Sequence, residues 1–201
     1  MKIVVATRNR GKLVEIVKLL GELSAGPAFE LVTIDEVAPG AVLREDRDTF
    51  EGNALAKARQ AADATGLAAI ADDSGLEVDV LGGAPGVWSA RYAGEPSDDG
   101  RNNAKLLQAL TGVPAAQRRG RYRCVAAFVD RVRGMEITEA GACEGIILEA
   151  ACGDGGFGYD PLFLVPSLSK TMAELPLQTK NEISHRAAAF RALAARLGGA
   201  R

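Results

Sequence analysis

Two adjacent carboxylates, Asp72 and Asp73, end an apolar run and precede a Ser74-Gly75 pair. A carboxylate withdrawn from water is costly unless a cation or several hydrogen-bond donors compensate it. Carboxylates so placed can bind a hard metal ion and orient or deprotonate water. The same four residues could instead form an ordinary Asx-type turn with no chemistry. Other parts of the chain have to distinguish these two interpretations.

The run Leu67–Ala71 predicts a strand with no polar face, buried on both sides in the middle of a sheet. We expect this strand to end at Ala71, so that the two carboxylates leave from its end. Side chains alternate along an extended chain, so Asp72 and Asp73 cannot both point into one site. One of them is therefore expected to be a ligand and the other structural.

A polar loop near the N-terminus could bind an anion. The β-branched run Lys2–Ala6 predicts a strand, and apolar residues at helical spacing from Leu13 predict a helix. Between them lie Thr7, Asn9 and Lys12, beside the free backbone N–H groups of the first helical turn. Cations there oppose the helix dipole unless an anion lies between them, which favours a phosphate site. A solvated basic turn is the alternative, and the spacing is neither a Walker P-loop nor GxGxxG.

Two later segments could bind a planar ligand. The glycine-rich stretch Cys152–Pro161 contains Phe157 and Tyr159, and glycines let a backbone approach a ligand while aromatic rings stack on a base. His185 and Arg186 precede a helix expected to run to about Leu197, and we interpret them as donors to a ligand. With one histidine a metal cluster is excluded, and a serine hydrolase lacks its G-x-S-x-G turn.

The remaining pattern predicts an α/β protein with a further strand, two further helices and a long hairpin, and places Trp88 in packing rather than stacking. These elements are a strand over Phe29–Ile34, a polar irregular segment over Asp35–Asp48, a helix over Asn53–Thr65, a helix over Asn102–Leu110, and strands over Tyr122–Val132 and Met135–Cys143 joined by Arg133-Gly134. The first of these helices follows a capping signal at Asp48-Thr49-Phe50-Glu51 and is stopped by Gly66.

Composition limits the protein class. The chain has 201 residues, of which 47% are apolar and 25% charged, and we expect one domain over residues 1–201. A formal net charge of −2 disfavours binding to bulk nucleic acid, and no apolar run approaches the ~20 residues of a membrane span. The N-terminus lacks a signal-peptide core, and three cysteines without metal-ligand spacing suit reduced thiols. We expect a cytoplasmic protein without membrane contact.

Six collinear motifs together resemble the inosine triphosphate pyrophosphatase (Ham1-like) family over nearly the whole chain. They are Thr7-x-Asn9-x-x-Lys12, Phe50-Glu51-x-Asn53-Ala54 with Lys57-Ala58, Ala71-Asp72-Asp73-Ser74-Gly75-Leu76, Gly83-x-Pro85-Gly86 with Ser89-Ala90-Arg91, Phe157-Gly158-Tyr159-Asp160-Pro161 and Ser184-His185-Arg186. Two positions depart from the family pattern: Arg8 stands where a small residue is frequent, and Trp88 where tyrosine is frequent.

The resemblance implies a Mg²⁺-dependent homodimeric enzyme that hydrolyses ITP, dITP and XTP to the monophosphate and pyrophosphate. It implies one mixed-sheet α/β domain with two lobes, a central cleft, and helices flanking a long twisted sheet. Two alternatives remain: a related pyrophosphatase for other modified or pyrimidine triphosphates, and a non-catalytic nucleotide-sensing module.

The resemblance also assigns residue roles. Asp73 would be the general base and a metal ligand, with Glu45 as second ligand in an acidic segment that also holds Asp46 and Asp48. The residues expected at the phosphates are Thr7, Asn9, Lys12 and Ser74. Those expected at the base are Phe157, Gly158, Tyr159, Asp160, Lys180, His185 and Arg186.

Overall fold

The computed structural model describes residues 1–23 and 29–199, and it contains a seven-stranded sheet in the order β2-β1-β3-β4-β5-β6-β7. β1 runs parallel to both β2 and β3, whereas β6 runs antiparallel to β5 and β7, so the sheet is mixed. The strands are β1 Lys2–Val5, β2 Glu30–Thr33, β3 Ala68–Val78, β4 Arg119–Asp130, β5 Met135–Ile147, β6 Phe163–Val165 and β7 Lys170–Thr171. The predicted α/β fold with a mixed sheet is confirmed.

The α-helices are α1 Arg10–Leu23, α2 Ile34–Val37, α3 Phe50–Thr65, α4 Asp99–Ala109, α5 Leu177–Ile183 and α6 His185–Gly199. The chain divides into two compact units. Unit 1 comprises Met1–Asp73, Cys124–Gly141 and His185–Arg201, and unit 2 comprises Ser74–Arg123 and Ala142–Ser184. Residues of β3, β4 and β5 belong to both units. The prediction of a single domain over residues 1–201 stays a prediction.

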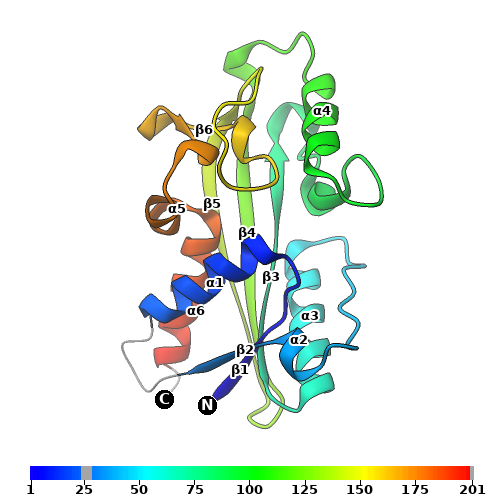
Figure 1. Ribbon diagram of the computed structural model, residues 1–201, viewed down its shortest axis with the longest axis vertical. Helices are drawn as coiled ribbons and strands as arrows, with labels where there is room; N and C mark the ends of the chain where they lie inside the picture. Colours follow the sequence, from blue (N-terminus) through cyan, green and yellow to red (C-terminus); the bar gives the residue numbers. More distant parts are fainter. Residues whose placement is uncertain (24–28, 200–201) are drawn as a thin grey trace. The chain divides into compact units, whose positions relative to one another are not determined.

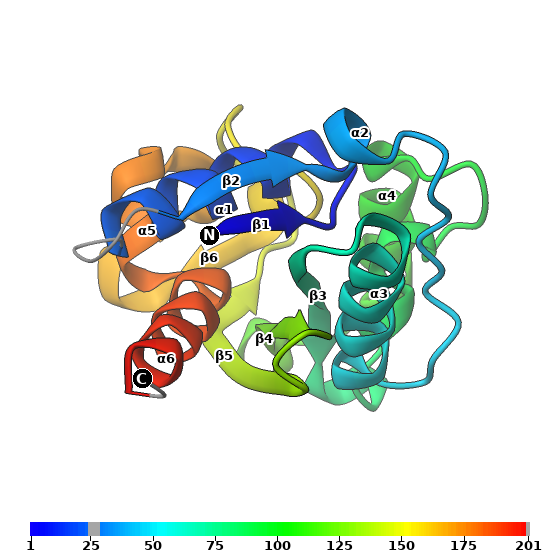
Figure 2. The ribbon, with the colours of Figure 1, turned by 90° about the horizontal axis from the view of Figure 1, so that it is seen from below.

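In unit 1, α1 and α6 lie side by side on one face of the sheet and α3 lies on the other (Figures 1 and 2). The core under α1 and α6 contains Ile16 of α1, Phe190 of α6 and Ile70 of β3, each almost fully buried. Small alanines of α3, such as Ala54 and Ala58, are fully buried as well. Both faces of this part of β3 are therefore covered, as its unbroken apolar sequence predicts.

Helix α3 follows its sequence signals closely. The side chain of Thr49 accepts a hydrogen bond from the backbone N–H of Gly52 at 3.0 Å, which caps the first turn. Gly66 ends the helix in the left-handed region at φ 69°. The helix begins at Phe50, before the expected Asn53 and within the predicted capping signal, because Thr49 is its N-cap.

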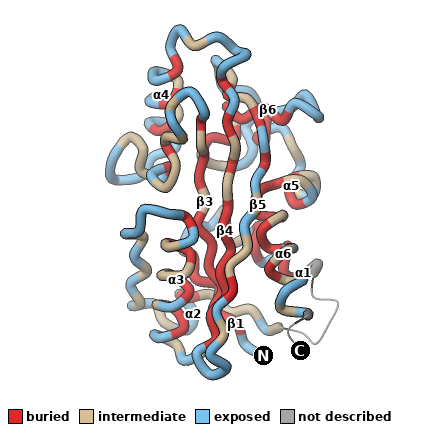
Figure 3. The backbone as a smooth tube through the Cα atoms, turned by 180° about the vertical axis from the view of Figure 1, so that it is seen from behind, coloured by how far each residue is buried: buried red, intermediate tan, exposed pale blue. Residues whose placement is uncertain are grey.

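Unit 2 has its own apolar core. Leu106 and Leu110, at the end of α4, are fully buried with Leu76 and Val78 of β3. Phe163 of β6 joins the same cluster. In Figure 3 the buried residues follow β3 and β4, while the outer surface of α4 is exposed. Helix α4 is thus a firmly packed element that can carry side chains into a site.

The structure corrects the expectation that the strand ends at Ala71. β3 continues through Asp72 and Asp73 to Val78, so the two carboxylates lie within the strand and do not form an Asx-type turn. Asp is depleted in strands because a carboxylate is costly to bury, but here cations and amide donors compensate both side chains.

One smaller expectation is also wrong, and one element was not expected. The segment expected to be irregular begins with α2, a short helix closed by a capping box between Thr33 and Glu36. Helix α5 was not expected. Trp88 is 55% exposed, with the Arg91 guanidinium 4.5 Å from its ring centroid, so it does not pack in the core of its unit, and packing at an interface stays a prediction.

Candidate active site

Asp72 lies at the centre of a buried charge cluster in unit 1. Its Oδ2 accepts hydrogen bonds from Nε and Nη2 of Arg186 at 3.2 and 3.3 Å, and lies 3.3 Å from Nζ of Lys12. Arg186 also donates to the carboxylate of Glu15. Burial would raise the pKa of Asp72, but Lys12 and Arg186 outweigh it and hold this pKa well below the usual range. Asp72 is therefore a permanent anion that fixes two cations.

Cys124 of β4 also contacts Asp72, on the same side of β3 as the charge cluster. Its Sγ lies 3.8 Å from Oδ2 of Asp72, and the thiol is fully buried. Burial and the charge of Asp72 raise the thiol pKa, so Cys124 stays protonated and donates weakly to the carboxylate.

Asp73 faces the opposite side, toward α3. Nδ2 of Asn53 donates to Oδ2 of Asp73 at 2.9 Å. Nζ of Lys57 donates to the carboxylate of Glu45 and, at 2.5 Å, to the backbone carbonyl of Asp72. Asp72 contacts α1 and α6 while Asp73 contacts α3, so the predicted alternation of the two carboxylates is confirmed.

The electrostatics of Asp73 differ from those of its neighbour. Burial raises the pKa of Asp73, Lys12 and Lys57 lower it, and Glu45 raises it again, with a net upward shift. Glu45 shifts the other way: burial raises its pKa, but Lys57 lowers it more. Two carboxylates thus lie near one lysine, and the charge of Glu45 raises the pKa of Asp73. Such a pair gains from an additional cation.

These carboxylates fit the needs of Mg²⁺. Among the residues that the structure describes, no group of three or more His, Cys, Asp or Glu side chains is placed to hold a metal ion. Mg²⁺ usually takes only one or two protein carboxylates, with waters and substrate phosphates completing its shell. Asp73 and Glu45 could supply hard oxygen donors in that number, and a bound cation would offset the upward effect of the Glu45 charge on the pKa of Asp73.

Side-chain to backbone hydrogen bonds within the predicted phosphate loop stabilise its conformation. Oγ1 of Thr7 accepts from the backbone N–H of Asn9 at 3.2 Å, and Oδ1 of Asn9 accepts from that of Lys12 at 3.0 Å. The Asn9 side chain thereby serves the first turn of α1, which starts at Arg10. This turn places Lys12 within reach of Asp72. Ser74, the fourth residue expected at the phosphates, lies half-buried in β3 and belongs to unit 2.

Arg8, where the chain departs from the family pattern, fastens another segment to this loop. Its guanidinium donates to Asp35 at 2.8 Å and to the carbonyls of Pro39 and Ala41 at 3.2 and 2.8 Å. The tethered segment leads to Glu45. A small residue could not make these contacts, so in this chain Arg8 links the phosphate loop to the acidic segment.

Unit 2 contains five of the residues expected at the base: Phe157, Gly158, Tyr159, Asp160 and Lys180. Oδ2 of Asp160 accepts from Nζ of Lys180 at 2.6 Å and from the backbone N–H of Phe157 at 3.2 Å. Nζ of Lys180 lies 5.5 Å from the centroid of the Phe157 ring. The hydroxyl of buried Tyr159 donates to the carbonyl of Ser89 at 2.8 Å, which orients the loop from inside.

The other two residues expected at the base belong to unit 1. His185 is the first residue of α6 and is 8% exposed, and Arg186 is in the buried cluster with Asp72 and Glu15. Their predicted contact with a base stays a prediction.

Sequence reasoning missed several partners. Tyr122 donates to Oδ1 of Asp160 at 3.1 Å, and Glu15, Asn53 and Lys57 support the two aspartates. Asn53 and Lys57 belong to one of the six motifs, but the sequence alone indicated no role for either residue. Glu15 is a buried charged residue among the apolar positions of α1, and this pattern could have indicated that it has a charged partner.

The substitution Gly156→Ala should damage this part of unit 2 more than Gly158→Ala. Both glycines have left-handed backbones, at φ +74° and +63°, so each alanine is strained. Only at Gly156 would the new Cβ collide with the Asp160 carboxylate, 2.1 Å away. We expect Gly156→Ala to lower the free energy of unfolding by about 1–3 kcal/mol more than Gly158→Ala, measured in urea. Equal losses would show that Asp160 moves aside without cost.

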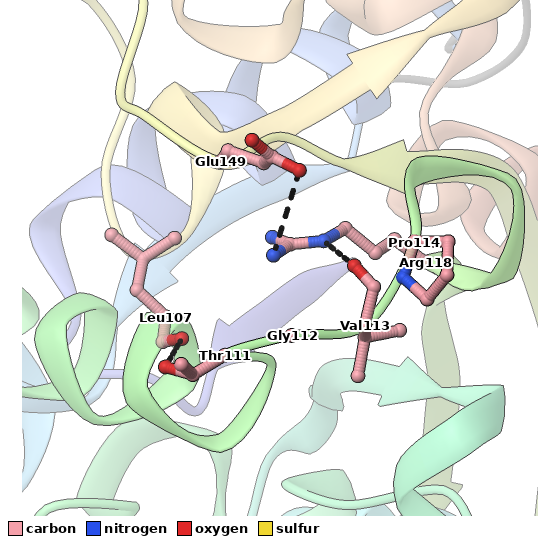
Figure 4. A pocket seen from close by; sticks show the side chains of 7 residues that line it. All are labelled: Leu107, Thr111, Gly112, Val113, Pro114, Arg118 and Glu149. Carbon is pink, nitrogen blue, oxygen red and sulfur yellow. Dashed lines mark hydrogen bonds and ion pairs between the residues drawn. The ribbon is translucent and has the colours of Figure 1, made fainter.

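A separate surface hollow of about 430 Å³ in unit 2 contains none of the predicted site residues (Figure 4). The buried Arg118 guanidinium lies beside it and donates to the carbonyls of Val113 and Leu110 at 3.0 and 2.9 Å. Arg118 therefore satisfies carbonyls that follow the end of α4, which is a structural task.

Comparison with known proteins identifies the family to which this chain belongs. A sequence model described as the Ham1 family matches residues 3–196, which includes every motif named above. The chain belongs to the Ham1 family. The resemblance predicted from the six motifs is confirmed.

Close relatives of this Ham1 family member cover almost its full length. A dITP/XTP pyrophosphatase of Desulforamulus reducens is 52% identical over 95% of this chain and 92% of its own. One of Geobacter sulfurreducens is 49% identical over 98% and 96%. The solved structure of the Staphylococcus aureus Ham1 protein has a TM-score of 0.87 and 39% identity, with 100% of each chain covered.

Proposed function

We propose that this Ham1 family member hydrolyses non-canonical purine nucleoside triphosphates, of the dITP, ITP and XTP type, to the nucleoside monophosphate and pyrophosphate. The names of relatives that share about half of its residues over nearly its whole length support this proposal. The observation that carries it is the pair of adjacent aspartates, one locked as an anion by Lys12 and Arg186 and the other with a raised pKa.

Hydrolysis between the α and β phosphates needs charge neutralisation and an aligned water more than covalent help. Mg²⁺, when bound, would neutralise phosphate oxygens and lower the pKa of bound water. Asp73 would orient the attacking water and accept its proton. Lys12 would hold phosphate oxygens, with Thr7, Asn9 and Ser74 as additional donors.

Base selectivity is assigned to the groups around Asp160 in unit 2. Phe157 would stack on the purine, and the ammonium of Lys180 is fixed beside it by Asp160. His185 and Arg186 are proposed as further donors. A donor that meets the O6 carbonyl of hypoxanthine or xanthine would meet another donor in adenine, whose amino group would leave it unpaired.

The direct test is a panel of triphosphates with Mg²⁺, in which pyrophosphate and orthophosphate are measured separately. We expect pyrophosphate as first product and higher kcat/KM for dITP, ITP and XTP than for ATP or GTP. Orthophosphate as first product, or equal turnover of ATP, would refute the proposal. Preference for a pyrimidine triphosphate would favour the related pyrophosphatase, and binding without turnover a nucleotide sensor.

Mg²⁺ dependence has its own prediction. EDTA should abolish activity and Mg²⁺ should restore it. Glu45→Gln should raise the Mg²⁺ concentration needed for half-maximal rate about tenfold. This factor corresponds to the loss of one charged contact worth about 1.4 kcal/mol. The matched controls are Asp46→Asn and Asp48→Asn, which remove the same charge from the same segment. A larger effect at either control would transfer the ligand role from Glu45.

Assembly and location belong to the same proposal. The family resemblance implies a homodimer, and light scattering should then give twice the chain mass of 21.0 kDa. A monomer at assay concentration would refute this part. Among the described residues, no helix is long and apolar enough to cross a membrane. We propose the cytoplasm as the location, where the nucleotide pool lies.

A further inference from the structure

We propose that helix α4 positions the nucleobase-binding loop, through Asp99 and Asn103, and so helps to set base specificity. This inference rests on the proposed function and extends it to two residues outside the six motifs. Neither residue needs to touch the substrate, so both are positioning residues.

The two side chains hold one residue of the loop from both sides of its backbone. The N–H of Gly158 donates to Oδ2 of Asp99 at 2.7 Å, and its carbonyl accepts from Nδ2 of Asn103 at 3.0 Å. Asp99 and Asn103 are four residues apart and therefore share one face of α4. A single rigid helix thus satisfies both polar groups of Gly158.

Gly158 lies directly after Phe157, the residue proposed to stack on the base. Its left-handed backbone, at φ +63°, is a conformation that glycine adopts and leaves easily. On the other side, the N–H of Phe157 is held by Oδ2 of Asp160. The backbone at Phe157 is therefore held by Asp160 and, through Gly158, by the side chains of α4. Removing the contacts from α4 would leave only the contact to Asp160.

Helix α4 is suited to this task because its own needs are met elsewhere. Asp98 is the N-cap, and its carboxylate accepts from the N–H of Arg101 at 2.7 Å. Leu106 and Leu110 anchor the other end in the core of unit 2. Asp99 is consequently available for Gly158, and the hydrogen bond it accepts is strengthened by its charge.

The experiment compares Asp99→Ala, Asp99→Asn and Asp98→Ser in the full chain. Loss of the charged contact in Asp99→Ala should raise KM for ITP about tenfold and change kcat less, because the phosphate groups are untouched. ITP over ATP selectivity should fall. Asp99→Asn keeps an acceptor oxygen and should restore most of KM. Asp98→Ser removes the neighbouring carboxylate but keeps a side-chain acceptor for the N–H of Arg101, so α4 stays capped and Gly158 is untouched, and its KM should stay near wild type.

Hydrogen exchange of the segment 152–161 provides a readout without turnover. Asp99→Ala and Asn103→Ala should speed exchange there relative to wild type and to Asp98→Ser. If wild type hydrolyses ITP while Asp99→Ala matches Asp98→Ser in KM, selectivity and exchange, the inference on α4 is overturned and the proposed function stands. If wild type hydrolyses no triphosphate, the proposed function fails, and unchanged exchange in Asp99→Ala would overturn the role of α4 as well.

Discussion

Asp73→Asn is expected to lower kcat by about 10²–10⁴-fold, the usual range for a general base, while the protein remains folded. The substituted amide removes the charge and the proton acceptor but keeps an oxygen that can accept from Nδ2 of Asn53. Nucleotide binding should persist. Loss of the folded state would instead make Asp73 a structural residue of β3, and wild-type turnover would exclude it as the base.

The same substitution should not destabilise the protein in the absence of divalent cations. Burial and Glu45 raise the pKa of Asp73 in the folded state. A raised carboxyl pKa contributes stability only below the unfolded value of about 3.9, and this contribution is lost as the pH rises through the folded pKa. At pH 7 the ionised side chain therefore opposes folding. Urea unfolding with EDTA should show Asp73→Asn at least as stable as wild type, and added Mg²⁺ should stabilise only wild type.

The elements that sequence predicted best are those with local signals. Thr49 and Gly66 mark both ends of α3, and the unbroken apolar run before Asp72 marks a strand covered on both faces. The alternation of Asp72 and Asp73 also followed from strand geometry alone. What failed was the end of β3, because the partners that allow carboxylates to remain within a strand come from α1, α3 and α6.

The missed short helices have a similar explanation. The four residues of α2 are too few for a periodic pattern, although Thr33 and Glu36 do form a readable capping box. Helix α5 has seven residues, begins after Pro176 and has no side-chain cap, so no local signal marks its start. Tertiary contacts decide whether such segments become helical.

Arg186 shows why sequence patterns alone do not reveal all the contacts of a site residue. Its sequence neighbours His185 and Ser184 suggested a donor to a ligand, whereas its contacts to Asp72 and Glu15 join positions separated by 114 and 171 residues. No local pattern reports such pairs. The structure gives Arg186 a buried structural task beside its predicted role at the base, and a substitution of Arg186 will therefore mix the two effects.

Asp72→Asn tests the buried cluster without altering Arg186 itself. It makes the same chemical change as Asp73→Asn, one residue earlier on β3, and we expect the opposite effect on stability. Arg186 and Lys12 would lose the anion between them, and breaking a buried pair in this way costs about 3–5 kcal/mol. The free energy of unfolding at pH 7, measured in urea, should fall by about that amount.

Acid unfolding separates this ion-pair effect from a mere packing defect. The folded-state pKa of Asp72 is depressed, so its stabilisation is present above the unfolded value of about 3.9 and is lost as the pH falls toward the folded pKa. Wild type should therefore lose stability steeply below about pH 4, and Asp72→Asn should lose less over the same range. A parallel acid dependence in the two proteins, or equal stability of Asp72→Asn and Asp73→Asn at pH 7, would show that Asp72 does not hold the cluster together. The opposite signs follow from the surroundings of the two side chains. Lys12 and Arg186 outweigh the effect of burial on Asp72, whereas burial and the charge of Glu45 outweigh the lysines near Asp73.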